Sequence, residues 1–462
     1  MSTTLSSRTG ATTTQGMASG ASSSAPGHTG GQATHGAPRY ARPQRPWSIR
    51  LFNALGGLLG KTGLRLTSLD EQSLLAAARR RTGLDDFGGE GFLAPLRILL
   101  KAADEEAELN SFGRIMVRTS VWLLLCNRLR VQEQLRRHPE ILTTPVRRPL
   151  LVLGLPRTGT TLLYNLLAQD PRARPLRTWE AVAPAPRDAE WGRQPDPRIA
   201  RTRRAIKLLC YVAPALPAVH AIDAEQPEEC SRLLMNTFVT AYAVMENHIP
   251  SYTRWFLEAP AEVIEASYRD YYRQLQVLQW QSPSPGHWVL KAPVHLFALG
   301  PLLRIFPDAA VVQLHRDPCK VVPSLCSLFA VYRGMASDRV EPLRLGPEVL
   351  DLCVEGLHRG GCAREAAGAD RVLDLKYVDL MADPIAVLRH IHEHFGYEFS
   401  AGAASRARQW LDANPQHKHG KHRYDLQQFG LDAQAIERAL GPYCRQYGIE
   451  PEGTAGKLGG QP

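Results

Sequence analysis

The stretch that decides the fold of this chain is Leu150-Leu-Val-Leu-Gly-Leu-Pro-Arg-Thr-Gly-Thr-Thr-Leu-Leu163. Its apolar start, residues 150–153, is short and bounded, as the buried strands of parallel sheets are. Gly154 and Gly159 allow the backbone to turn sharply and to approach a ligand closely. The loop then enters a helix, whose free N–H groups and positive dipole end bind anions. We therefore expect a phosphate or sulfate to be held by Thr158, Gly159, Thr160 and Thr161.

This loop is close to a Walker A motif but lacks the lysine of that motif. Gly154 and Gly159 have the G-x4-G spacing, and Thr161 stands where the magnesium-binding hydroxyl belongs. Thr160 replaces the lysine that contacts the β- and γ-phosphates, and the loop carries Arg157 instead. The loop therefore predicts a bound anion other than ATP with magnesium. The alternative is an ordinary strand-to-helix turn that holds two glycines.

A second strand, turn and helix are predicted between residues 309 and 325. Arg316 follows the apolar strand, Asp317 is a good N-cap, and Pro318 suits the first helical position. Ser324 lies about two turns into the helix. A guanidinium fork and a hydroxyl make a sensible pair for a second phosphate. A plain junction with a surface arginine is the alternative.

Together these segments resemble the sulfotransferase superfamily. Residues 155–161 resemble its 5′-phosphosulfate loop, and Arg316 with Ser324 resembles its 3′-phosphate element. The stretch Trp288-Val-Leu-Lys-Ala-Pro-Val-His295 is similar to the family's strand that ends in a lysine. The pattern is similar to the broad bacterial-type group and to tyrosylprotein sulfotransferases. The resemblance covers roughly residues 146–450 and implies 3′-phosphoadenosine 5′-phosphosulfate (PAPS) as the sulfonate donor.

The patterns and the resemblance predict an α/β fold. We expect a P-loop-like, mainly parallel sheet flanked by helices, with a helical N-terminal extension. Residues 1–46 are rich in Ser, Thr, Gly, Ala and Pro and are expected to form a disordered tail. The helical N-terminal region is expected over 47–145 and the catalytic domain over 146–450, followed by a flexible tail over 451–462.

Sulfonate transfer resembles phosphoryl transfer, so cations should stabilise the leaving oxygen and a base should take the acceptor proton. The candidate cations are Arg157 and Lys291. The preferred base is Glu180, because tyrosylprotein and heparan-type sulfotransferases carry a glutamate after the same helix. The alternative is that Glu180 only pairs with Arg174 or Arg177. The second candidate base is His295, although it stands four residues after the lysine, where the cytosolic family members have two.

A cation-rich segment near the C-terminus is also implicated by the resemblance. Related sulfotransferases close a basic, glycine-containing segment over the nucleotide, and Lys418, Lys421 and Arg423 are placed to do so here. A solvated basic loop is the alternative. No metal is expected, because no cysteine or carboxylate stands at ligand spacing among the neighbouring histidines.

Composition agrees with an enzyme that binds a polyanion. The net charge is +10, and no compact basic and aromatic motif for nucleic acid appears. The eight cysteines are scattered without a CxxC, which favours reduced thiols and a cytoplasmic location. No apolar run is long enough to span a membrane, although residues 47–59 can form either an interfacial helix or a helix packed on the protein. Self-association stays open.

The sequence therefore predicts a sulfotransferase that moves a sulfonate from PAPS to a hydroxyl of a small-molecule or lipid acceptor. The broken apolar stretch 208–219 is expected to form either the acceptor wall or plain core. The alternative functions are a P-loop nucleotide-dependent kinase and a non-catalytic nucleotide-binding scaffold.

Overall fold

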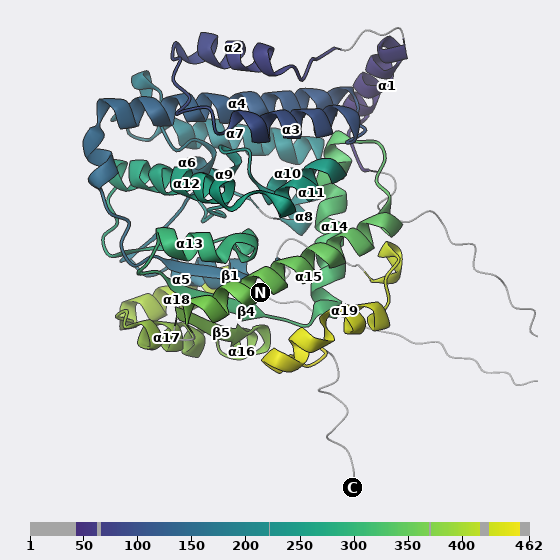
Figure 1. The fold of residues 1–462 in the computed structure, drawn as a ribbon. Coiled ribbons are helices and arrows are strands. Elements are labelled where there is room, and N and C mark those ends of the chain that lie inside the picture. The colour runs from purple at the N-terminus through teal and green to yellow at the C-terminus, as the bar shows by residue number, and fades with distance from the viewer. Residues whose placement is uncertain (1–42, 62–65, 221, 369–370, 416–424, 453–462) are drawn as a thin grey trace, which may run out of the picture. The chain divides into compact units, whose positions relative to one another are not determined.

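The computed structural model describes residues 43–61, 66–220, 222–368, 371–415 and 425–452 (Figure 1). Lys418, Lys421 and Arg423, and the predicted tails up to residue 42 and from residue 453, lie outside the described residues. Arg45, which we expected in the N-terminal tail, donates from Nε to the Gly334 carbonyl at 2.9 Å. The described residues belong to one compact unit.

The centre of this unit is a five-stranded, wholly parallel sheet, which confirms the predicted α/β class. Its order is β2 (Ala173–Pro175), β3 (His287–Lys291), β1 (Leu150–Gly154), β4 (Ala310–His315) and β5 (Val372–Lys376). Every residue of β1 is buried, and Val152 lies opposite Lys291 on one side and Val312 on the other. The carboxyl ends of parallel strands meet at one edge, where ligands of such folds bind. Residues predicted for the site follow β1, β3 and β4 at this edge.

The sheet separates two apolar cores because neighbouring residues of a strand point to opposite faces. Leu150 and Val152 of β1 pack with α5 (Thr160–Leu167), α17 (Pro384–Phe395) and α18 (Ala401–Ala413). Leu151 and Leu153 belong to the larger core on the other face. Figure 1 shows α16, α17 and α18 on one side of the sheet and α12 and α13 on the other. The bounds of the remaining helices around the sheet are α12 (Ala261–Gln281), α13 (Leu299–Ile305), α14 (Pro318–Ala336), α15 (Pro342–Ala367), α16 (Tyr377–Ala382) and α19 (Ala433–Tyr447).

The helices expected between residues 47 and 145 are present. They are α1 (Trp47–Lys61), α2 (Glu71–Thr82), α3 (Leu93–Glu105), α4 (Ser111–Arg137) and the 3-10 helix η1 (Pro139–Thr143). Leu125 and Leu129 of α4 are buried and belong to the same large core as the sheet. Arg128 ties α4 to the rest of the unit, because its Nη1 donates to the Asn236 carbonyl at 3.0 Å. The N-terminal helices therefore share a core with the sheet.

Short helices fill the long connection between β2 and β3. They are α6 (Thr178–Val182), η2 (Asp188–Glu190), α7 (Pro197–Val212), α8 (Leu216–Val219), α9 (Arg232–Met235), α10 (Ala241–Glu246) and α11 (Pro250–Glu258). Two further 3-10 helices are η3 (Pro293–Ala298) and η5 (Gln427–Phe429). Residues 223–229 are not helical, and α9 begins only at Arg232. In the part of the chain that is described, no helix is long and apolar enough to cross a bilayer.

Candidate active site

The loop after β1 has the backbone that its glycines predict. Gly154 and Gly159 have φ values of 134° and 94°, and Arg157 between them has φ 74°. A Cβ on Gly154 would lie 2.4 Å from the Leu314 carbonyl oxygen, so only glycine fits beside β4. Thr158 Oγ1 donates to the Leu155 carbonyl at 2.8 Å and closes the loop. Helix α5 then begins at Thr160, as the sequence predicts.

The predicted donor residues of the two strand-to-helix junctions lie together. Arg157 Nε donates to Ser324 Oγ at 3.0 Å, and its Nη1 donates to the Val219 carbonyl at 3.1 Å. Arg316 Nη1 donates to the Arg157 carbonyl at 3.0 Å. Helix α14 begins as expected, since Asp317 accepts from the Cys319 N–H at 2.8 Å. One cluster therefore holds the cation of the loop and the arginine and hydroxyl predicted for the second phosphate.

Arg316 also forms an ion pair with a carboxylate from the C-terminal segment. Its Nε and Nη2 donate to the two oxygens of Glu452 at 2.7 and 3.0 Å. The Glu452 N–H in turn donates to Asp317 Oδ2 at 2.9 Å, and the Arg316 guanidinium lies 3.9 Å from the Tyr377 ring centroid. This is the paired, planar geometry in which guanidinium groups bind carboxylates and phosphates alike.

Lys291, at the end of β3, joins the donor loop to a second carboxylate. Its Nζ lies 2.7 Å from Glu229 Oε1 and 3.4 Å from Thr161 Oγ1. The other oxygen of Glu229 accepts from the Tyr242 hydroxyl at 2.8 Å. Burial alone would raise the pKa of the Glu229 carboxyl, but the Lys291 ammonium lowers it to about 2. Glu229 is therefore ionised and held between a cation and a hydroxyl.

A largely apolar cavity opens beside these groups. Its empty space, mouth included, is about 920 Å³. Leu155 and Pro156 of the donor loop line it, as do the polar residues His220, Glu229 and Tyr242. Burial lowers the pKa of the His220 imidazole, which favours its neutral form. The rest of the lining is mostly apolar and aromatic, with Met245, Phe256, Phe297, Leu325, Phe329 and Cys353 among its members. The lining includes His220 but none of residues 208–219, the segment that we expected to form an acceptor wall.

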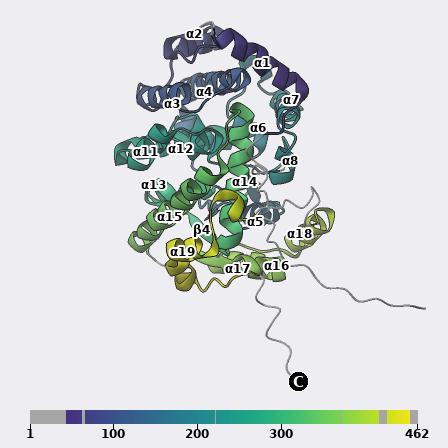
Figure 2. The ribbon, with the colours of Figure 1, turned by 90° about the vertical axis from the view of Figure 1, so that its right-hand side faces the viewer.

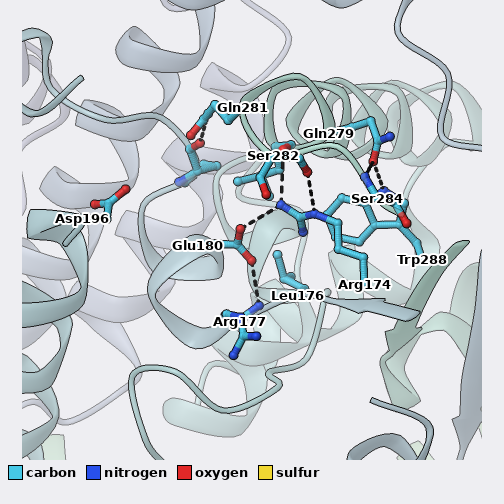
Figure 3. Close-up of polar contacts among 12 residues, drawn as sticks. Arg174, Leu176, Arg177, Glu180, Asp196, Gln279, Gln281, Ser282, Ser284 and Trp288 are labelled. Carbon is cyan, nitrogen blue, oxygen red and sulfur yellow. Dashed lines mark hydrogen bonds and ion pairs between the residues drawn. The ribbon is translucent and has the colours of Figure 1, made fainter. Parts of the chain in front are cut away.

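Glu180 lies in a different environment, which Figure 3 shows. Its Oε1 accepts from Arg174 Nη2 at 2.8 Å, and its Oε2 accepts from the Arg177 N–H at 3.0 Å. Arg174 is stacked on Trp288, 3.9 Å from a ring centroid, and donates to the Ser282 carbonyl at 2.8 Å. Both carboxylate oxygens are thus used in a buried ion pair and in the cap of α6. The cavity lining includes Glu229 and does not include Glu180.

His295 is buried next to Cys230, the residue that follows Glu229. Its Nδ1 is 2.8 Å from the Tyr268 hydroxyl, and its Nε2 is 3.2 Å from Cys230 Sγ. Burial lowers the pKa of the imidazole to about 3, so it is neutral. Cys230 follows Glu229 and donates its N–H to the Lys291 carbonyl at 3.0 Å. His295 therefore supports the backbone that carries Glu229, and its role as a base stays a prediction.

Three residues of this site were missed by the sequence analysis: Glu229, Tyr242 and Glu452. The only signal for Glu229 was an acidic stretch, which carried no role without the sheet that brings Lys291 beside it. Among the described residues, no group of three His, Cys, Asp or Glu side chains is arranged to hold a metal ion.

Comparisons with known proteins agree with this geometry. Residues 149–401 match the sulfotransferase family. The chain is 26% identical, over 65% of its length and 75% of the relative, to the omega-hydroxy-beta-dihydromenaquinone-9 sulfotransferase Stf3 of Mycobacterium bovis. It is also similar to two crystal structures, each 30% identical over 98% of the solved chain. Sulfotransferase STF9 from Mycobacterium avium covers 84% of this chain with a TM-score of 0.75. Sulfotransferase STF1 from Mycobacterium tuberculosis covers 81% with a TM-score of 0.69. Because the family match spans more than half of the chain, and the fold and the loop agree with it, the chain belongs to the sulfotransferase family.

Proposed function

We propose that this sulfotransferase takes its sulfonate from PAPS and transfers it to the hydroxyl of an apolar, lipid-like alcohol. The observation that carries the proposal is the cavity, because it is largely apolar and yet reaches Glu229 and the donor loop. An apolar pocket with a few convergent polar groups is the usual form of a small-molecule site. The M. bovis relative is named as a sulfotransferase of an omega-hydroxy menaquinone, which supports a lipid alcohol as the acceptor class.

The donor end of the site follows from the cations around the loop. Arg157, Lys291 and the N–H groups of the first turn of α5 would bind the phosphosulfate, and Arg316 with Ser324 would bind the 3′-phosphate. Lys291 contacts both Thr161 of the donor loop and Glu229, so its ammonium group would supply positive charge to a phosphosulfate held on this loop. Preorganised cations that meet developing charge are the main source of catalysis in such transfers.

The acceptor end requires a base, and Glu229 is the carboxylate that faces the cavity. The acceptor oxygen attacks sulfur, the bond from sulfur to the 5′-phosphate oxygen breaks, and the acceptor proton passes to Glu229. The products are a sulfate ester and adenosine 3′,5′-bisphosphate. Tyr242 holds the carboxylate in place through its 2.8 Å hydrogen bond. Glu180 and His295 remain the rival bases that the sequence predicts.

A reducing, cytoplasmic location also belongs to this proposal. All eight cysteines lie in the described residues and are free thiols, five of them partly or wholly covered in apolar surroundings such as those of Cys126 and Cys353. Free thiols in this number suit a compartment that keeps cysteine reduced.

The proposal is tested by binding and turnover. Calorimetric titration should detect adenosine 3′,5′-bisphosphate, and ATP with magnesium should bind much more weakly. With PAPS, a long-chain alcohol should gain the mass of one SO3 group, and this activity should survive EDTA. Turnover that requires magnesium and ATP would favour a kinase. Nucleotide binding without turnover on any alcohol or phenol would favour a scaffold.

A further inference from the structure

Helix α1 presents its apolar side chains outward. Trp47, Leu51, Leu55 and Leu58 are 71%, 51%, 55% and 61% exposed, and their spacing places them along one face of the helix. The opposite face is anchored to α4, since Asn53 Oδ1 accepts from the Phe112 N–H at 2.9 Å. The helix is therefore held in an orientation that leaves its apolar face uncovered.

The exposed stripe continues onto helix α7. Leu208 and Tyr211 are 60% and 52% exposed, and the Tyr211 hydroxyl lies 2.8 Å from Ser48 Oγ of α1. Figure 2 shows α1 and α7 next to each other, with α8 following α7. We name this surface the docking face, which consists of Trp47, Leu51, Leu55, Leu58, Leu208 and Tyr211. Clustered exposed apolar side chains on one side of a protein mark an interaction site.

All charged residues of α1 and α7 are basic. The first acidic residue of the chain is Asp70, and α7 has no acidic residue along its whole length. Arg50, Arg204 and Lys207 are exposed on the two helices. The nearby acids Glu190 and Glu225 pair with two other arginines of α7, Arg201 and Arg203. Apolar side chains flanked by unopposed cations match the surface of an anionic bilayer, where tryptophan and leucine enter the interface and cations meet headgroups.

We propose that the docking face binds the surface of an anionic lipid bilayer and so brings the acceptor cavity to its lipid substrate. The chain runs from Tyr211 on the docking face through α8 to His220 in the cavity wall, and the Val219 carbonyl binds Arg157. The bilayer surface and the reacting groups are thereby connected through a single short segment. The choice of a bilayer as partner rests on the proposed lipid-like acceptor, whereas the binding itself can be measured without turnover.

Vesicle flotation tests the binding. The full chain should float with vesicles of phosphatidylcholine and phosphatidylglycerol in equal amounts, less with phosphatidylcholine alone, and less at high salt. The double variant Leu51→Glu, Leu55→Glu should bind the anionic vesicles at least about tenfold more weakly, since two exposed leucines that would enter the bilayer are replaced by charges. The matched control is Leu142→Glu, Leu343→Glu, which changes two leucines that are 51% and 59% exposed outside the docking face. The control should bind like the unmodified protein.

Several outcomes would overturn the proposal. The proposal fails if the unmodified protein does not float with the anionic vesicles, or if the two double variants bind these vesicles equally well. Sedimentation that finds a dimer, which the Leu51→Glu, Leu55→Glu variant converts to monomers, would assign the face to a second copy of the chain. Turnover separates this inference from the proposed function. The docking-face variant should sulfate a short soluble alcohol at the unmodified rate and a long-chain alcohol in vesicles about tenfold more slowly. If no form sulfates any alcohol, the proposed function fails while the flotation result stands.

Discussion

Two glutamates near the same edge of the sheet illustrate two uses of a buried ion pair. Glu180 is bound by Arg174 and by a backbone N–H, and Arg174 is itself fixed on Trp288 and on the Ser282 carbonyl. Glu229 is bound by Lys291 and Tyr242, and it borders the cavity. Glu180 is buried, Glu229 is partly buried, and each is paired with a buried cation, so such pairing alone does not distinguish a structural group from a reactive one.

The cations make the difference. The guanidinium of Arg174 is planar, and its Nε and Nη2 donate to fixed partners, whereas the Lys291 ammonium sits on a flexible stem between Glu229 and Thr161. We infer that an anion on the donor loop draws Lys291 away from Glu229, after which burial raises the pKa of the freed carboxyl. We infer that the first pair holds β2 and α6 together and that the second takes part in the reaction.

The largest effect is expected from removing the charge of the proposed base. Glu229→Gln should bind adenosine 3′,5′-bisphosphate with near-native affinity and lose about 10²–10⁴-fold in kcat, the usual contribution of a general base. Glu180→Gln is the matched control and should keep kcat within a few-fold. Steady-state kinetics with a long-chain alcohol and calorimetric titration measure both. If Glu180→Gln abolishes turnover in a folded protein and Glu229→Gln does not, the base is Glu180, as the sequence predicts.

The structural role of the Arg174–Glu180 pair is tested by the free energy of unfolding. Arg174→Met leaves the Glu180 carboxylate buried without its cation, which should lower the free energy of unfolding by about 3–5 kcal/mol. Adding Glu180→Gln in the same chain should restore part of this loss, because no uncompensated charge then remains. Denaturant unfolding followed by circular dichroism gives both values. An Arg174→Met protein of unchanged stability would contradict the structural role of this pair.

Donor affinity tests whether the two junction arginines act on different ends of the nucleotide. Arg157→Ala and Arg316→Ala should each weaken PAPS binding roughly tenfold or more, since each removes a charge-assisted contact of about 1.5–3 kcal/mol. Adenosine 5′-phosphosulfate, which has no 3′-phosphate, should respond to Arg157→Ala and hardly to Arg316→Ala. If both variants lose the same affinity for both nucleotides, Arg316 does not bind the 3′-phosphate and this assignment is wrong.

The smallest effect concerns Glu452, whose pair with Arg316 shares features of both glutamate sites. Like the pair of Glu180, it joins the carboxylate to a guanidinium, but it is bidentate and both side chains are partly exposed. If the 3′-phosphate displaces this carboxylate, Glu452→Gln should bind adenosine 3′,5′-bisphosphate up to a few-fold more tightly, because a partly exposed pair is worth at most about 1 kcal/mol. Adenosine 5′-phosphosulfate should bind unchanged in the same titration. A lower melting temperature without any gain in affinity would instead make the pair structural.

The parts of this protein that local chemistry dictates were predicted from the sequence. Gly154 and Gly159 require the turn that follows β1, and Asp317 with Pro318 begins α14 as expected. Short apolar runs gave the buried strands of a parallel sheet. These features depend on residues within a few positions of one another, so a sequence pattern is enough to find them.

Contacts between distant residues were decided only by the tertiary structure. Lys291 and Glu229 are 62 residues apart, and Arg316 and Glu452 are 136 apart. The local sequence of a glutamate after the loop helix does not distinguish a side chain that faces a cavity from one that faces an arginine. In the structure, Glu180 faces Arg174. The apolar pattern of α1 likewise does not reveal that its leucines point outward. The physical reason is that burial, pairing and exposure belong to the surroundings of a side chain, and the order of the sheet and the packing of the helices create those surroundings.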